Sequence, residues 1–220
     1  MPFDFLRRKP AAAKAGGAAD AQAAADERAG SATVPFEGLT DEWRLRGRMY
    51  ASGRLSDALN RRAETPITDV SWAPADGSAP FSPVPGLKSV DPYDLILVLA
   101  GPDSVPPMTE EEKVAHKVHK LAFDVAIEAP PYRVVGTVYL RPGTEPAQLM
   151  DRSTEMFVPV VGGVASIGGQ EISTEGPVDS VLVNRFYVRG VEQIDLSTGE
   201  KPVKLPGQPL GGTTWRERVR

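Results

Sequence analysis

The chain contains no cysteine and only two histidines, His116 and His119, in 220 residues. The absence of cysteine excludes disulfide bonds and thiolate chemistry. Two histidines three positions apart are too few for most metal sites, and the lysines beside them oppose a bound cation. We therefore expect no metal and no cofactor. The residues also do not supply a Ser-His-Asp or Cys-His catalytic set, so we expect a protein that is not an enzyme.

Long apolar runs are missing as well. No stretch approaches the roughly twenty apolar residues that span a bilayer. Residues 1–9 place their basic side chains after a very short apolar patch, the reverse of a secretory signal. We expect a cytoplasmic protein. Phe3, Phe5 and Leu6, beside those basic residues, suit weak contact with a membrane surface or a partner, and the alternative is an untethered terminus.

Large apolar side chains are absent between Pro10 and Thr33, where Ala, Gly and small polar residues dominate. Such a segment cannot offset its ordering entropy by burial. The sequence predicts a disordered N-terminal arm over residues 1–33. Residues 196–220 are again rich in Pro and Gly and predict a loose tail, with Trp215 as a possible docking point.

Proline and glycine are abundant, with 21 of each. They favour short strands, turns and loops over a helical bundle. The net charge of −4 argues against a surface devoted to neutralising phosphates, although it allows a local basic face. The chain should therefore be mainly β with short helices.

Residues 43–51 show the period of a half-buried strand, because apolar residues alternate with Arg44, Arg46, Arg48 and Tyr50. This alternation places three arginines on one face. The flanking patterns predict a short helix over residues 54–62, a strand over 66–72 and a strand buried on both faces over 95–99.

The strand pattern returns at residues 132–140. Trp43 matches Tyr132, Arg44 matches Arg133 and Gly47 matches Gly136 at a constant offset (136 − 47 = 89). Weaker matches continue at offsets of 90, 91 and 88, which pair Leu59 with Leu149, Ile67 with Val158, and Val90 with Val178. We interpret the pattern as a duplication. It predicts two related small β-barrel-like halves, at residues 34–104 and 105–195.

The second half should open with a short helix near residues 109–117, where Thr109 and Glu112 have capping-box spacing. Residues 121–127 alternate as a strand does. Residues 181–188 read as one long strand that 191–194 continue beyond Gly190. Two glycine pairs, Gly162-Gly163 and Gly168-Gly169, predict a hairpin turn or a bulge, because no Lys-Ser or Lys-Thr follows to make a phosphate loop.

The predicted helix carries the most polar cluster, formed by Arg54, Ser56, Asp57 and Asn60. In a functional interpretation, Arg54 and Asn60 bond a small ligand and Asp57 orients them. In a structural one, Ser56 or Asp57 caps the helix. The second half lacks the Arg, Ser and Asn types, so we favour the structural interpretation.

Two resemblances follow from these motifs. Arg44 and Arg48, followed by Asp69-Val70-Ser71, resemble the two-part motif of cyclic-di-GMP-binding PilZ domains, which places arginines on phosphates. Pro74 stands where that motif closes with glycine, and this puts the close backbone approach in doubt. The match covers only a few residues.

The segment Gly53-Arg54-Leu55-Ser56-Asp57-Ala58-Leu59-Asn60, followed by residues 67–70, resembles a motif in small bacterial β-rich domains of unknown function. Those domains look like Sm-like or SH3-like barrels with a short helix between their first strands, and Val183-Asn184-Arg185 is similar to a closing strand. The resemblance covers residues 42–101 well and 132–190 poorly. It implies a fold and no activity.

We therefore expect a non-catalytic scaffold or a regulatory protein-binding module that recognises a partner protein or its own copies. The alternative is a nucleotide or nucleic-acid binder that uses an arginine-rich strand face. The ligand-binding candidates are Arg44, Arg46, Arg48, Arg54, Asp57 and Asn60.

Overall fold

Strands make up most of the computed structural model, which describes residues 32–51, 53–104, 120–149, 154–174 and 176–196. The protein is mainly β, as the alternating patterns predict. Its strands are β1 (Ala32–Leu39), β2 (Trp43–Ala51), β3 (Thr65–Pro74), β4 (Ser82–Pro83), β5 (Ser89–Val90), β6 (Leu97–Ala100), β7 (Leu121–Ala129), β8 (Tyr132–Leu140), β9 (Phe157–Ile167), β10 (Gln170–Glu171), β11 (Ser180–Asn184) and β12 (Gly190–Gln193).

One α-helix, α2 (Leu55–Asn60), lies between β2 and β3 in the described part of the chain. Four short 3-10 turns accompany it: η1 (Pro92–Asp94), η2 (Pro102–Ser104), η3 (Pro146–Gln148) and η4 (Arg185–Tyr187). Most of the predicted N-terminal arm, the helix expected at 109–117 and all but the first residue of the predicted C-terminal tail lie outside the described residues. Among the described residues, no helix is long and apolar enough to cross a membrane.

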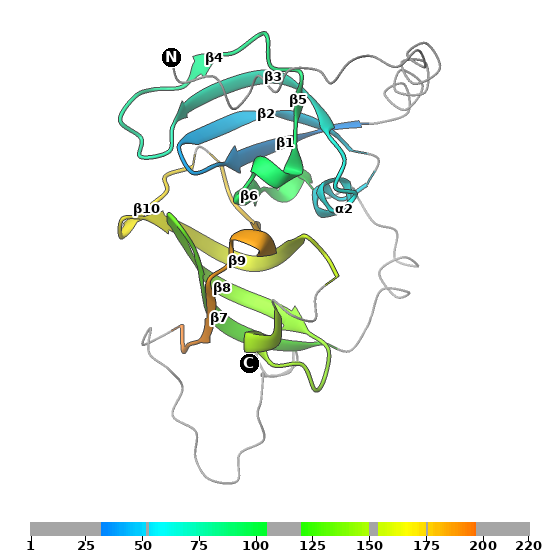
Figure 1. Cartoon of the computed structure of the whole chain (residues 1–220), viewed down its shortest axis with the longest axis vertical. Helices are drawn as coiled ribbons and strands as arrows, with labels where there is room; N and C mark the ends of the chain where they lie inside the picture. The colour runs from blue at the N-terminus through cyan, green and yellow to red at the C-terminus, as the bar shows by residue number, and fades with distance from the viewer. Residues whose placement is uncertain (1–31, 52, 105–119, 150–153, 175, 197–220) are drawn as a thin grey trace. The chain divides into compact units, whose positions relative to one another are not determined.

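The strands form one antiparallel sheet in the order β12-β7-β8-β9-β11-β6-β1-β2-β3-β4, with β5 beside β3 and β10 beside β9. We call residues 32–104 the N-terminal half and 120–196 the C-terminal half. Figure 1 shows β1, β2 and β3 together in the first and β7, β8 and β9 together in the second. The halves join where β6 pairs with β11, and pairing among the described strands closes neither half into a ring.

β2 and β3 pair with a bulge opposite Gly47, the one glycine of β2. Arg46 pairs with Ser71 and Arg48 with Thr68, so two residues of β3 lie opposite Gly47. The first of them, Asp69, has a φ of 54°, the left-handed conformation that such a bulge requires. A Cβ on Gly47 would come within 2.9 Å of the Thr68 carbonyl oxygen, so the site favours glycine.

β8 and β9 pair with the same irregularity. Val135 pairs with Val164 and Thr137 with Val161, which leaves Gly162 and Gly163 opposite Gly136. Gly162 has a φ of 58°. The bulge predicted at the first glycine pair is confirmed, and the second pair forms the turn between β9 and β10.

Both halves end in a capped 3-10 turn followed by a short strand. The Asp91 side chain accepts a hydrogen bond from the Tyr93 amide before β6. The Asn184 side chain accepts one from the Phe186 amide before β12. The prediction of one strand over residues 181–188 is therefore wrong, because the Asn184 cap ends β11 and turns the chain through η4.

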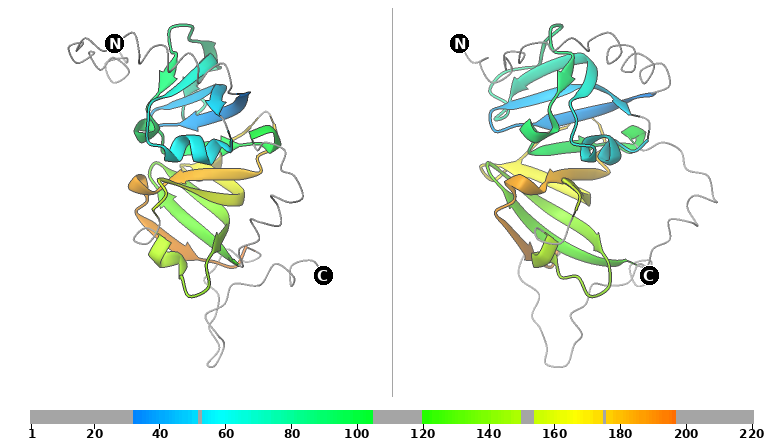
Figure 2. Two further views of the ribbon diagram at one scale, coloured as in Figure 1. Left: turned by 90° about the vertical axis from the view of Figure 1, so that its right-hand side faces the viewer. Right: turned by 45° about the vertical axis from the view of Figure 1, so that its right-hand side comes forward.

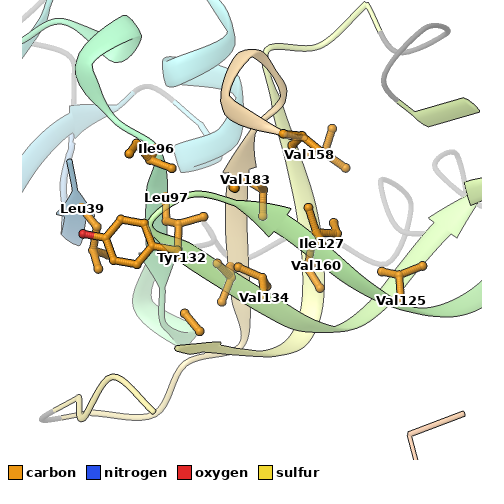
Figure 3. Packing of buried hydrophobic residues seen from close by; sticks show 14 of the residues in the cluster. Leu39, Ile96, Leu97, Val125, Ile127, Tyr132, Val134, Val158, Val160 and Val183 are labelled. Atoms are coloured by element: carbon orange, nitrogen blue, oxygen red, sulfur yellow. The ribbon is translucent and has the colours of Figure 1, made fainter. Parts of the chain in front are cut away.

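The hydrophobic core crosses the joint. Leu97 and Leu99 of β6 belong to the same hydrophobic cluster as Val125, Ile127 and other residues of the C-terminal half, and Figure 3 labels Leu97 among the residues of this cluster. In the other direction, Phe157 and Leu182 of the C-terminal half pack in the cluster of the N-terminal half. Since each half completes its core with side chains of the other, the described residues from Thr33 onward belong to one compact unit.

Candidate functional site

The arginine face predicted for β2 exists, and its residues have partners within the fold. The Nε atoms of Arg44 and Arg46 donate to the two carboxylate oxygens of Glu37 on β1, with a distance of 2.8 Å for Arg46. Arg44 also donates to the Ser173 carbonyl of the C-terminal half. The side chains of Arg44 and Glu37 are only 9% and 12% exposed. Buried charges need such pairing, so Arg44 and Glu37 serve the fold.

Phe81 covers the same face from the loop that precedes β4. Its ring centre lies 4.0 Å from the Arg46 Cζ atom and 5.5 Å from the Arg44 Cζ atom. These distances are in the range of cation–π attraction. The alternation of β2 predicts the arginines, but no local pattern indicates that a residue of the Pro-rich loop folds over them.

Arg48 is the exposed member of the face. Its Nε atom donates to the Thr33 hydroxyl at 2.9 Å, and its guanidinium donates to the Thr33 carbonyl at 2.7 Å. Arg48 therefore ties the start of β1 to β2. Of the three arginines it is the one whose replacement leaves the Glu37 ion pairs intact.

A cavity of about 380 Å³ opens beside the arginine face. Arg46 and Glu37 line it on one side, and Asp103 and Thr174 line it elsewhere. Two carboxylates face one guanidinium among these four residues, so the lining does not have the positive excess that a phosphate group prefers.

The polar cluster of the helix does not form one site. Asn60 accepts a hydrogen bond from the Phe157 amide at 2.7 Å and donates to the Phe157 carbonyl at 3.4 Å, so it joins α2 to the start of β9. Figure 2 shows α2 between the two halves in both views. Arg54, Asp57 and Asn60 do not line the cavities of about 380, 270 and 220 Å³ that other described residues form.

The predicted cap of α2 is wrong. Arg54 occupies the N-cap position, and its side chain makes no capping hydrogen bond. The helix is held instead by burial of Leu55, Ala58 and Leu59. Asp57 lies in the first turn, where its charge complements the helix dipole.

The PilZ-like residues lie on neighbouring strands, because Arg48 pairs with Thr68 and Arg46 with Ser71 across β2 and β3. Asp69 between them occupies the bulge. Arg44 and Arg48 point to partners on β1, which are Glu37 and Thr33.

Sequence reasoning missed an exposed aromatic pair at the joint. Tyr93 of η1 and Phe186 of η4 are 44% and 50% exposed, and their rings stack with centres 5.9 Å apart and planes 15° apart. The Cζ atoms of Arg62 and Arg185 lie 5.9 and 4.9 Å from the Phe186 ring centre. We call these four residues the aromatic–arginine patch. Its only signal in the sequence is that both aromatics are the second residue of a capped turn.

Tyr187 borders the patch and is tied to it, because its hydroxyl donates to the Tyr93 carbonyl at 2.9 Å. Burial, and then the carboxylates of Asp94, Asp41 and Asp91, raise the pKa of Tyr187 above its ordinary value. The phenol therefore stays protonated as a hydrogen-bond donor at neutral pH.

The part of the chain that the structure describes holds no group of three or more His, Cys, Asp or Glu side chains placed to bind a metal ion. Comparisons with models of protein families, with curated proteins and with solved structures find no match to this chain.

Proposed function

We propose that the protein is a non-catalytic binding module, a scaffold or regulator that recognises a partner protein or a second copy of itself. The observation that carries the proposal is the exposed aromatic–arginine patch. Aromatic and arginine side chains are enriched at protein interfaces and dominate their binding energy. Two large rings left half exposed beside two guanidinium groups form a surface of that composition.

We propose further that the module arose by duplication into two small barrel-like halves of the Sm-like or SH3-like kind. The matching bulges at Gly47 and Gly136 support this, as do the matching caps of Asp91 and Asn184. Two backbone hydrogen bonds at equivalent positions also support the duplication. The Ile96 amide donates to the Leu39 carbonyl at 2.8 Å, and the Arg189 amide donates to the Glu128 carbonyl at 2.7 Å.

The proposed duplication changes the offset after the first two strands. The bulge residues Asp69 and Gly162 are 93 positions apart, not 89. With the same offset of 93, the pairing of Thr65 with Val90 in the N-terminal half is equivalent to the pairing of Val158 with Val183 in the C-terminal half. Ile67 is then equivalent to Val160 and Val90 to Val183, in place of the matches to Val158 and Val178 that the sequence suggests.

The alternative is recognition of a nucleotide or nucleic acid through Arg44, Arg46 and Arg48. A phosphate on this face would have to compete with Glu37, which is largely buried between two of the guanidinium groups. Displacing a buried carboxylate leaves it unpaired, and that is costly. The geometry therefore favours the protein-binding proposal.

A thermal-shift screen with cyclic di-GMP and single-stranded oligonucleotides, run beside light scattering for oligomeric state, separates the two functions. The protein-binding proposal predicts no shift with either ligand. A monomer that shifts with a nucleotide, and loses the shift in the Arg48→Ala variant, would assign the alternative. Phe186→Ala is the matched variant, because it alters the aromatic–arginine patch and leaves the arginine face unchanged.

The N-terminal tip adds a separate proposal. Phe3, Phe5 and Leu6 lie outside the described residues, and their apolar and basic composition supports weak contact of a cytoplasmic protein with an anionic membrane surface. Flotation with vesicles that contain anionic lipid tests this, and a chain with all three residues changed to Ser should remain unbound.

A further inference from the structure

The joint between the halves is a strand-addition complex within one chain. β11 adds antiparallel to the outer edge of β6, and Leu182 pairs with Val98. Leu182 is 3% exposed and packs in the hydrophobic cluster of the N-terminal half. The N-terminal half thus receives a strand through backbone hydrogen bonds and anchors it with one leucine side chain, which is how sheet edges recognise extended peptides.

The side chain of Leu182, which we call the anchor, occupies an apolar pocket built by three elements. Val34 of β1, Leu55 of α2, and Val98 and Ala100 of β6 belong to the same cluster as Leu182. Val98 and Ala100 alternate with Leu97 and Leu99, which face the other core. β6, the strand that receives β11, therefore presents two of its four residues to this apolar pocket.

The C-terminal half carries the equivalent elements around a cavity. By the offsets of the proposed duplication, β7, η3 and β12 stand where β1, α2 and β6 stand. A cavity of about 220 Å³ lies between them, lined by apolar residues that include Phe123, Pro146, Ala147 and Val191 and by the polar residues Thr144, Glu145 and Gln193. In these offsets Phe123 is equivalent to Val34, Val191 is equivalent to Val98, and Gln193 is equivalent to Ala100. The cavity therefore occupies the position of the apolar pocket that Leu182 fills in the N-terminal half.

The edge of β12 beside this cavity has no described strand next to it. Among the described strands, β12 pairs only with β7. A Cβ atom placed on Gly190 would meet no atom within 4 Å, whereas its equivalent, Leu97, is fully buried at the joint. Within the described residues, the C-terminal half therefore has both parts of a strand-binding site, an edge without a strand partner and a largely apolar pocket next to it.

A second copy of the chain is a poor occupant of this site. The segment of the N-terminal half that is equivalent to β11 contains β5 and pairs with β3. It has Ser89 at the anchor position, where β11 has Leu182. Pro83 and Pro85 precede it, and prolines on a sheet edge prevent further pairing. The fitting occupant is a strand of another protein with a leucine-sized side chain at the anchor.

We propose that the outer edge of β12 and the adjoining cavity bind an extended segment of a partner protein, added antiparallel to β12 with one leucine-sized apolar side chain in the cavity. This inference rests on the proposed function and assigns it a site apart from the aromatic–arginine patch. On the face of β12 away from the cavity, Gly190 and Glu192 are the equivalents of Leu97 and Leu99 in β6. The contact of a bound strand is therefore apolar only on the face toward the cavity. The complex is accordingly weaker and more reversible than the internal joint.

The test uses the strand that fills the equivalent site. A fluorescent peptide with the sequence Asp-Ser-Val-Leu-Val-Asn-Arg, as in residues 179–185, is titrated with the full chain and followed by fluorescence anisotropy. The matched peptide has Asp in place of the leucine. The proposal predicts saturable binding of the first peptide and binding at least about tenfold weaker for the second, since a charge cannot enter the cavity without cost.

Variants of the protein locate the binding. Ala147 is exposed and lines the cavity, so Ala147→Trp blocks the pocket without altering the core, and Ala147→Ser is its control. Binding should be lost in the first variant and kept in the second. Failure of the peptide to bind, equal binding of both peptides, or binding that survives Ala147→Trp would overturn the proposal.

The same titration separates this site from the protein-binding function in general. The Phe186→Ala variant should bind the peptide as the unchanged chain does. Light scattering that shows a dimer of the chain alone, abolished by Ala147→Trp, would assign the edge to a second copy and overturn the choice of partner. Loss of the β12 site would leave the aromatic–arginine patch and its own test untouched.

Discussion

The side chain of Asn184 is fully buried and holds three backbone groups at the joint. It donates to the carbonyls of Leu95 and Pro92 at 2.8 and 3.4 Å and accepts from the Phe186 amide at 3.1 Å. The two carbonyls belong to the N-terminal half and the amide to the C-terminal half. One amide side chain therefore caps a turn and ties the halves together.

Asn184→Ala should lower the free energy of unfolding by about 2–3 kcal/mol, because the buried carbonyl of Leu95 would lose its partner. Asp91, its counterpart in the proposed duplication, caps one amide at the surface, so Asp91→Ala should cost only about 1 kcal/mol. Urea unfolding of the two variants measures the difference. Equal losses would show that the bonds across the joint contribute nothing.

Tyr132 links the halves in the same way. Its ring is 1% exposed, and its hydroxyl donates to the Thr40 carbonyl at 2.5 Å. Burial first, and then the Asp41 carboxylate, raise the pKa of this phenol well above its ordinary value. The folded protein therefore keeps Tyr132 protonated at a pH where the unfolded chain ionises it.

The free energy of unfolding should fall as the pH rises above about 10, the pKa of an unfolded tyrosine. Below that pH the contribution of Tyr132 is fully present. Tyr132→Phe should cost about 1 kcal/mol at pH 7 through the lost hydrogen bond, and it should lose less stability between pH 10 and 12. Urea unfolding across this range tests it, and parallel curves for the two proteins would contradict it.

At this scale the sequence predicts which residues share a face, but not what they contact. Period-two alternation places Arg44, Arg46 and Arg48 together, and they do lie on one face of β2. Glu37 and Phe81 become their partners only because β1 lies beside β2 and a long loop folds back. Glu37 lies only seven residues before Arg44, so its contact is local in the sequence, but the contact with Phe81 is not.

The two bulges are the elements that most clearly distinguish the halves. Gly162 and Asp69 occupy the same left-handed position, but only glycine adopts it without steric cost. The N-terminal half therefore stores strain at Asp69 that the C-terminal half does not.

Asp69→Gly should raise the free energy of unfolding by about 0.5–1 kcal/mol, since relief of the left-handed conformation outweighs the added entropy of the unfolded chain. Asp69→Ala should lower it by about 1 kcal/mol, because alanine tolerates the left-handed conformation less well than aspartate does. Thermal unfolding of both variants measures the signs. A destabilised glycine variant would mean that the Asp69 carboxylate has an essential partner.

Element prediction succeeded where burial alternates and failed where a side chain intervenes. β2, β7 and β8 match their expected ranges within about two residues, the usual uncertainty of element ends. The strand expected over 181–188 breaks because Asn184 caps η4, and an asparagine within an apolar run gives no local warning of that. In the proposed duplication the offset also changes by four between β2 and β3, and for this reason the sequence comparison did not pair Asp91 with Asn184.

For the whole molecule, the crossing of side chains between the two cores implies one cooperative unit. β6 presents alternate residues to each core, and Phe157 and Leu182 return into the N-terminal cluster. Unfolding either half would expose apolar surface of the other. An intermediate with one half folded is therefore unfavourable.

Two probes should consequently report one transition. In a Trp215→Phe background the remaining tryptophans, Trp43 and Trp72, stack 4.4 Å apart in the N-terminal half, so their fluorescence follows that half alone while far-UV circular dichroism follows both. Val160→Ala, a cavity in the C-terminal core, should cost about 2 kcal/mol and shift both urea midpoints equally. A shift seen by circular dichroism but not by fluorescence would mean that the halves unfold independently, and the joint would then be a contact between two domains.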